Sequence, residues 1–141
     1  MAEKPVVVLD TNVFVSGLLS PKGAPGIIFQ RFRLGQFSIV TSRAQIAEIQ
    51  AVLARSSLRK ALPTGTPREV LQFFVKLKRL TEVLNPPKLA WDFGDRDDHF
   101  LLDLAVHAKA QFLVTGDKAL QRLLLVGQCA VVSPVEFVAR V

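Results

Sequence analysis

The stretch VVVLD at residues 6–10 constrains the fold more than any other part of this chain. A continuous run of β-branched and aliphatic residues is typical of a strand buried on both faces, as in parallel sheets covered by helices. Three later runs have the same character and are predicted strands: FSIVTS at 37–42, QFLVT at 111–115 and CAVVS at 129–133. Their alternation with helical patterns predicts an α/β fold, a mainly parallel sheet with helices on both faces.

Helical periodicity fills most of the sequence between these strands. We expect Ser42 to cap one of the helices, Gly35 to end another, and residues 81–84 to form a further short strand. The predicted helices are IIFQRFRLG at 27–35, RAQIAEIQAVLARSSLRK at 43–60, REVLQFFVKLKRL at 68–80, DDHFLLDLAVHAKA at 97–110, DKALQRLLL at 117–125 and PVEFVARV at 134–141.

The length of 141 residues fits one domain, residues 1–141, that is large enough to fold without a disulfide or a structural metal. The single cysteine, Cys129, lies in an apolar run, so we expect a buried, inert thiol and a reducing compartment. No apolar run reaches the length that crosses a bilayer, and the start lacks the apolar core of a secretory signal. These features predict a cytoplasmic protein that does not contact membranes.

Charge is distributed unevenly along the chain, which has a net charge of +6. Residues 11–91 carry twelve Lys and Arg but only three acids, Glu48, Glu69 and Glu82. The segment DFGDRDD at 92–98 then places four aspartates within seven residues. A basic body around a few concentrated acids is typical of a protein that attracts a polyanion and acts on it locally. A merely solubilising basic surface is the alternative explanation of the charge.

Four acids stand out by their positions. In open α/β sheets, ligands bind outside the carboxyl ends of the strands, where Asp10 and Asp117 follow two predicted strands. Asp98 lies in the first turn of its helix, at one end of the helical layer. Each of these aspartates could instead cap a helix. Glu48 lies inside a helix with no basic residue three or four positions away, so neither a cap nor an ion pair explains it.

Several carboxylates held together repel one another, and hard divalent cations relieve that repulsion. Oxygen ligands suit Mg²⁺ or Mn²⁺, and such ions usually keep waters and bind phosphate oxygens. One or two ions at these acids could activate a water and neutralise the charge that develops when a phosphodiester is attacked.

A second set of residues has the spacing of a zinc site. His99, Asp103 and His107 recur every four residues on one helical face. We favour a simpler interpretation, a polar outer face with an Asp103–His107 surface pair. The sequence contains no GxGxxG, GxxxxGK[ST], HExxH or paired CxxC motif, so the commonest nucleotide and zinc signatures are excluded.

Taken in order, five segments make the chain resemble PIN-domain proteins, specifically the bacterial and archaeal group of VapC-like toxins of toxin–antitoxin systems. The segments are VVVLDTNVFVSGLL, TSRAQIAEIQAVL, DRDDHFLLDLA, FLVTGDKAL and VVSPVEFV. The resemblance implies a three-layer α/β/α sandwich similar to the 5′-nuclease fold, and a Mg²⁺- or Mn²⁺-dependent endoribonuclease, often dimeric, that a cognate antitoxin neutralises. The residues it assigns to an acidic metal site are Asp10, Glu48, Asp98 and Asp117, with Asn12 and Thr115 as supporting polar groups.

The acidic segment departs from the pattern of these relatives, which often read Asp-Pro-x-Asp-Asp. Here Gly94 and Asp95 stand in the corresponding places. We choose Asp98 as the third site acid because DHFLLDLA keeps the spacing from the acid to the buried face of the helix. Asp95 and Asp97 are candidates for accessory acids.

The leading hypothesis is a metal-dependent ribonuclease in which Arg43 and Lys118, each near a proposed site acid, contact RNA. A non-catalytic RNA- or protein-binding module with the same fold is the alternative; it would bind RNA without cleaving it. A phosphatase with Asp10 as nucleophile ranks lower, because LDTNV lacks the second aspartate two residues on that common aspartate phosphatases use.

Overall fold

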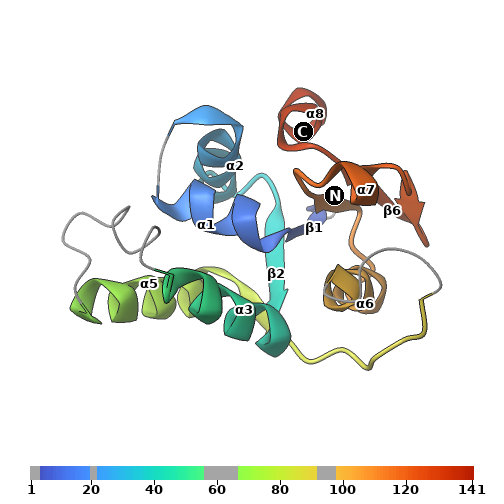
Figure 1. Ribbon diagram of the computed structural model, residues 1–141. Coiled ribbons are helices and arrows are strands. Elements are labelled where there is room, and N and C mark those ends of the chain that lie inside the picture. The colour runs from blue at the N-terminus through green and yellow to red at the C-terminus, as the bar shows by residue number, and fades with distance from the viewer. Residues whose placement is uncertain (1–3, 20–21, 56–66, 92–97) are drawn as a thin grey trace.

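The fold is built on a six-stranded sheet with the strand order β3-β2-β1-β4-β6-β5 (Figure 1). In this computed structural model, the described residues are 4–19, 22–55, 67–91 and 98–141. All neighbouring strands pair in parallel except β5, which runs antiparallel to β6. The strands are β1 (Val6–Leu9), β2 (Ser38–Ser42), β3 (Glu82–Leu84), β4 (Phe112–Val114), β5 (Leu125–Val126) and β6 (Cys129–Val132).

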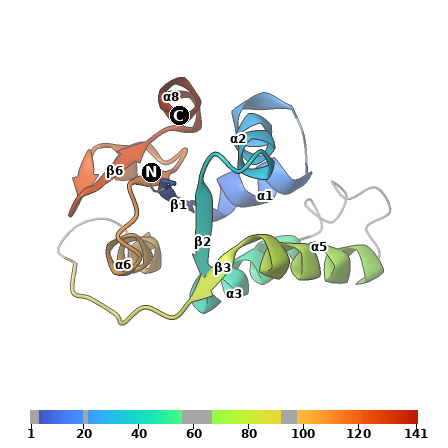
Figure 2. The ribbon, with the colours of Figure 1, turned by 180° about the vertical axis from the view of Figure 1, so that it is seen from behind.

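Helices separate most of these strands in the sequence. The described helices are α1 (Thr11–Leu19), α2 (Gly23–Arg33), α3 (Arg43–Leu53), α5 (Pro67–Leu80), α6 (His99–His107), α7 (Lys118–Gln121) and α8 (Pro134–Arg140). In both views α2 and α8 lie together on one side of the strands and α6 lies on the other (Figures 1 and 2). The predicted α/β fold with a mainly parallel sheet between two helical layers is confirmed.

The central strand β1 divides the apolar core into two parts. Val7 and Leu9 point to one face and pack in a cluster with residues of α1, α2, α3 and α8. Val8 points to the other face and packs with residues of α6 and α7. Strand side chains alternate between faces, so β1 needs apolar residues at every position. The unbroken VVVL run therefore reflects a strand that is covered on both sides.

The first two helices approach each other closely because Gly17 has no side chain. A Cβ added at this position would lie 2.2 Å from Cδ2 of Phe29 and 2.7 Å from the backbone oxygen of Pro25. The contact brings the first turn of α2 against α1, and both helices contribute residues to the pocket described below.

Several helix boundaries differ from the predicted ones. The helix predicted at 27–35 begins at Gly23, because a proline in the first turn costs no hydrogen bond. The helix predicted at 43–60 ends at Leu53, and residues 56–60 lie outside the described part of the chain. The cap predicted at Ser42 is confirmed, since its Oγ accepts a hydrogen bond from the backbone N–H of Gln45 at 3.1 Å.

The prediction of a helix over residues 117–125 was wrong in its second half. Helix α7 ends at Gln121, and Leu124 adopts a left-handed backbone conformation with φ of +61°. Residues 125–126 then form β5, and the Val131 N–H donates to the Leu124 carbonyl at 2.9 Å. Pairing with β6 therefore overrides a locally helical pattern.

The expected surface pair of Asp103 and His107 was also wrong. Asp103 is only 6% exposed, and its Oδ1 accepts hydrogen bonds from Trp91 Nε1 at 2.8 Å and from the Leu89 N–H at 3.0 Å. The carboxylate thus anchors Leu89 and Trp91, which follow β3, to the buried side of α6.

None of the helices in the described ranges is long and apolar enough to span a membrane.

Candidate functional site

A hollow of about 450 Å³ lies beside the carboxyl ends of the two central strands, β1 and β4. Four carboxylates from distant parts of the sequence line it, together with small and uncharged residues. The described lining residues are Asp10, Asn12, Val13, Ser16, Pro25, Glu48, Asp98, Gly116 and Asp117. The structure therefore brings all four predicted site acids and Asn12 to one pocket, and it places no Lys, Arg or His among the described residues that line it.

Asp10 is fixed by its neighbours on β4. Its backbone N–H donates to the Val114 carbonyl at 2.8 Å, and its carboxylate Oδ2 accepts from Thr115 Oγ1 at 2.6 Å. The Asp10 carbonyl accepts from the Phe14 N–H at 2.9 Å, which begins helix α1. The backbone of Asp10 thus starts the helix, while its side chain lies along the pocket.

Asp117 caps helix α7. Its Oδ1 accepts from the Ala119 N–H at 2.8 Å, and its own N–H donates to Thr115 Oγ1 at 3.0 Å. The fully buried Thr115 hydroxyl therefore accepts from one site acid and donates to the other. This chain of hydrogen bonds fixes Asp117 relative to Asp10 across the turn after β4.

Glu48 reaches the pocket from the middle of α3. Its Oε2 accepts from Thr11 Oγ1 at 3.1 Å, and Thr11 is buried beside Asp10. The half-buried Glu48 faces the start of α1 and has no helix terminus to cap. One partner of Glu48 is thus a buried hydroxyl on another helix, which the local sequence does not reveal.

Asp98 occupies the N-cap position of α6, yet its side chain makes no capping hydrogen bond. Instead it is half-buried and lines the pocket. The two further candidate acids, Asp95 and Asp97, lie outside the described residues. The RNA-contact candidates Arg43 and Lys118 are exposed at the first positions of α3 and α7, and neither lines the hollow.

The chemistry of the pocket suits a hard divalent cation. All charged side chains among the described lining residues are carboxylates. The other polar side chains there are the Asn12 amide and the Ser16 hydroxyl. Mg²⁺ and Mn²⁺ prefer such oxygen ligands. Within the described ranges, no three acidic, His or Cys side chains already stand close enough together to hold an ion. The donor set of the pocket fits such an ion, which usually binds through one or two carboxylates and keeps several waters.

The zinc spacing on α6 does not produce a site in the described part of the chain. Asp103 faces the buried side of the helix and is engaged by Trp91 and Leu89, whereas His107 is exposed. Asp103 therefore serves as a buried structural carboxylate.

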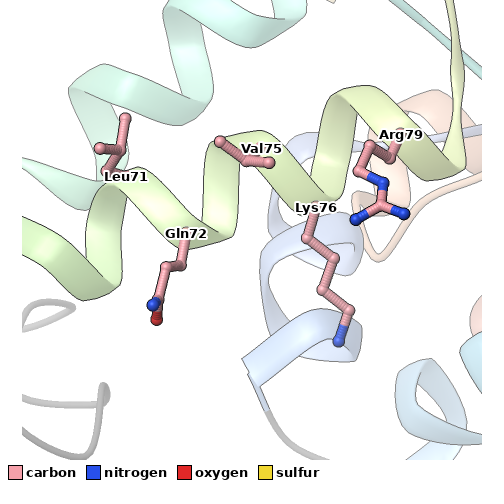
Figure 3. Close-up of a pocket in the computed structure, with 5 residues that line it drawn as sticks. All are labelled: Leu71, Gln72, Val75, Lys76 and Arg79. Atoms are coloured by element: carbon pink, nitrogen blue, oxygen red, sulfur yellow. The ribbon is translucent and has the colours of Figure 1, made fainter.

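A second hollow, of about 590 Å³, lies along α5 (Figure 3). Leu71 and Val75, one helical turn apart, are 64% and 50% exposed there. The other described lining residues are Gln72, Lys76 and Arg79. The surface combines an exposed apolar pair with positive charge.

Three residues around the acidic pocket were not identified from the sequence: Thr11, Ser16 and Gln45. Thr11 and Gln45 are buried polar side chains. A signal for Gln45 was present, because it lies four residues before Ile49 and seven before Val52, in the buried stripe of α3. A polar residue inside an apolar stripe indicates a specific buried partner.

These features define an α/β protein with an acidic, oxygen-lined pocket at the carboxyl edge of a parallel sheet. Residues 6–119 match the family model described as PIN domain. The chain is 32% identical over 114 residues to the uncharacterized protein MJ1680 of Methanocaldococcus jannaschii, covering 81% of this chain and 72% of that protein. The chain therefore belongs to the PIN-domain family.

The fold is also similar to a chain in the crystal structure of VapBC2 from Rickettsia felis bound to a DNA fragment from their promoter. The TM-score is 0.60 at 14% sequence identity, with 91% of this chain and 98% of that chain covered. At that level of identity, the likeness concerns the fold alone.

Proposed function

We propose that this protein is a metal-dependent endoribonuclease that hydrolyses RNA phosphodiester bonds and acts as the toxin of a toxin–antitoxin pair. The main support for the proposal is that four acids from distant parts of the sequence line one pocket: Asp10, Glu48, Asp98 and Asp117. The net charge of +6 supports a polyanionic substrate. Membership of the PIN-domain family supports the same reaction class, since PIN-domain nucleases use divalent metal ions.

In this proposal the four acids hold one or two Mg²⁺ or Mn²⁺ ions. When bound, the ion supplies positive charge against the negative charge that builds up on the phosphoryl group. Thr115 holds Asp10 and Asp117 in place, and Thr11 holds Glu48. Asn12, exposed on the first turn of α1, orients a bound phosphate or water.

The RNA backbone approaches over the exposed basic residues around the hollow, with Arg43 and Lys118 as the candidates. Each is the first residue of a helix that carries or follows a site acid. Asp95 and Asp97 remain candidates for additional acids near Asp98.

The test is cleavage of a single-stranded RNA with Mn²⁺, comparing the wild type with Asp10→Asn and Asp117→Asn. Asparagine still accepts the hydrogen bonds that Thr115 and Ala119 donate, so both variants should fold while each loses one negative charge. We expect the cleavage rate to fall by at least roughly 100-fold in each, because a metal ligand is weakened.

Glu136→Gln is the matched control, since Glu136 is an exposed acid on α8 that does not line the pocket. Its cleavage rate should equal that of the wild type. Folded Asp10→Asn and Asp117→Asn variants that cleave as fast as the wild type would refute the proposal. RNA binding without metal and without cleavage by the wild type would establish the alternative, a non-catalytic binding module.

For partners, we propose a cytoplasmic antitoxin that docks on α5, and a homodimer as the assembled form. The resemblance to VapC-like toxins and the fold shared with a chain of the VapBC2 structure support both proposals, the antitoxin partner and the homodimer. The exposed pair Leu71 and Val75 favours a protein over RNA, because nucleic acid backbone gains nothing from aliphatic side chains. Lys76 and Arg79 favour an acidic segment with apolar residues one turn apart.

Co-expression with the small DNA-binding protein expected from an adjacent gene tests this docking site. Leu71→Asp and Val75→Asp should abolish co-purification, whereas Val135→Asp, the same kind of change at an exposed valine on α8, should leave it unchanged. Equal co-purification of all three variants would place the partner elsewhere on the chain.

A further inference from the structure

The side chain of Gln45 joins three elements beneath the acidic pocket. It lies in the first turn of α3 and is completely buried. Its Nε2 donates to the carbonyl of Leu9, the last residue of β1, and its Oε1 accepts from Thr41 Oγ1 on β2. One amide therefore ties α3 to the carboxyl ends of the two strands that it packs against.

These contacts hold the chain on both sides of Asp10. Gln45 binds the carbonyl of the residue before it, and Glu48, one turn further along α3, accepts from the hydroxyl of the residue after it, Thr11. The separation between the carboxylates of Asp10 and Glu48 is therefore set by how α3 sits on β1. Thr115, which follows β4, holds the Asp10 carboxylate from the side opposite α3 and does not contact Glu48 through this hydrogen bond.

Packing alone does not require glutamine at this position. The neighbouring positions of the same stripe are apolar, and a methionine would fill a similar volume without burying an amide. Both ends of the amide have partners, so the group acts as a specific connection between elements.

We propose that Gln45 is a positioning residue for the metal site: it sets the distance between Asp10 and Glu48 and thereby the affinity for a divalent cation. The inference rests on the proposed function, because it assumes that these acids bind Mg²⁺ or Mn²⁺. Residues that orient metal ligands through hydrogen bonds typically change metal affinity 10- to 100-fold when they are removed. Gln45 acts one step further away, through the backbone beside Asp10, so about a 10-fold effect is expected.

The test measures the dissociation constant for Mn²⁺, by electron paramagnetic resonance or calorimetry, together with the melting temperature without metal. Gln45→Met should weaken Mn²⁺ binding about 10-fold in the folded protein. A purely structural role would lower the melting temperature and leave the dissociation constant unchanged. Ser133→Ala is the control, because it removes the N-cap of α8, outside the pocket. It should lower the melting temperature only.

A second pair of variants covers the case in which Gln45→Met does not fold. Thr41→Val removes the hydroxyl that orients the amide, whereas Thr41→Ser keeps it. We expect weaker Mn²⁺ binding in Thr41→Val than in Thr41→Ser. Gln45→Met and Thr41→Val proteins that bind Mn²⁺ as tightly as the wild type would overturn the inference alone. A wild type that binds no Mn²⁺ would overturn the proposed function, and this inference with it.

Discussion

The buried carboxylate of Asp103 should contribute measurably to stability, and the chain contains a built-in reporter for it. Asp103→Leu replaces the carboxylate by an apolar group of similar shape and removes the acceptor for Trp91 Nε1 and for the Leu89 N–H. Trp91 is the single tryptophan of the chain, so its fluorescence reports directly on this contact.

The expected loss follows from the geometry. Two hydrogen bonds to a charged acceptor contribute about 1.5–3 kcal/mol each at most. Trp91 is half-buried and Leu89 is 45% exposed, so both donors can be rehydrated in the variant. Removing a 6% exposed carboxylate also relieves its desolvation cost. We therefore expect a net loss of about 2 kcal/mol, or a fall in melting temperature of roughly 6 °C for a chain of this size.

The assay is urea unfolding followed by Trp91 emission, with Asp103→Asn as the control. Asparagine keeps one acceptor oxygen, so it should lose less than half as much stability as leucine and keep the native emission maximum. Asp103→Leu should shift the native emission to longer wavelength, because the indole N–H turns to water. Equal stability of the two variants, with unchanged emission, would refute the assigned role of this carboxylate.

Three further outcomes are expected from the fold. Gly17→Ala should lower stability by about 1–3 kcal/mol in thermal unfolding, although alanine favours helices, because its Cβ would overlap Phe29. Thr115→Val should lower stability by about 2 kcal/mol in urea, more than Thr115→Ser, since only the serine keeps the hydroxyl bound to Asp10. Burial raises the pKa of the Cys129 thiol from 9.0 to about 12. The unfolded chain loses this proton first, so the thiol's contribution is complete below about pH 9 and is lost as pH rises from 9 to 12. Cys129→Ala should therefore show a shallower alkaline decline in unfolding free energy.

Much of the fold could be predicted because its strands are defined by local composition. The VVVL run at 6–9 is apolar on both faces, as is typical of a parallel strand covered on both sides. Parallel strands bring their carboxyl ends to one edge of the sheet, so the sequence predicts that Asp10 and Asp117 lie at the same edge. The sequence singles out Glu48 because neither a helix cap nor a local ion pair explains an acid at that position, and this residue lines the same pocket.

The remaining features depend on contacts that local sequence does not encode. Leu124 leaves the helical pattern because β6 supplies a partner for the following residues. Asp103 lies four residues from His99 and from His107, a spacing that suggests a polar outer face of the helix. In the structure it is buried and accepts a hydrogen bond from Trp91, twelve residues earlier in the chain. In both places a long-range partner decides the conformation.

Asp117 illustrates why a capping role and a role in the site do not exclude each other. Its Oδ1 is engaged by the Ala119 N–H, as helix capping predicts, and the same residue lines the acidic hollow. Capping needs only an oxygen acceptor, which asparagine supplies equally well. A metal site needs negative charge. The Asp117→Asn variant therefore separates the two roles: unchanged stability with lost Mn²⁺ binding would show that the charge at this position belongs to the pocket.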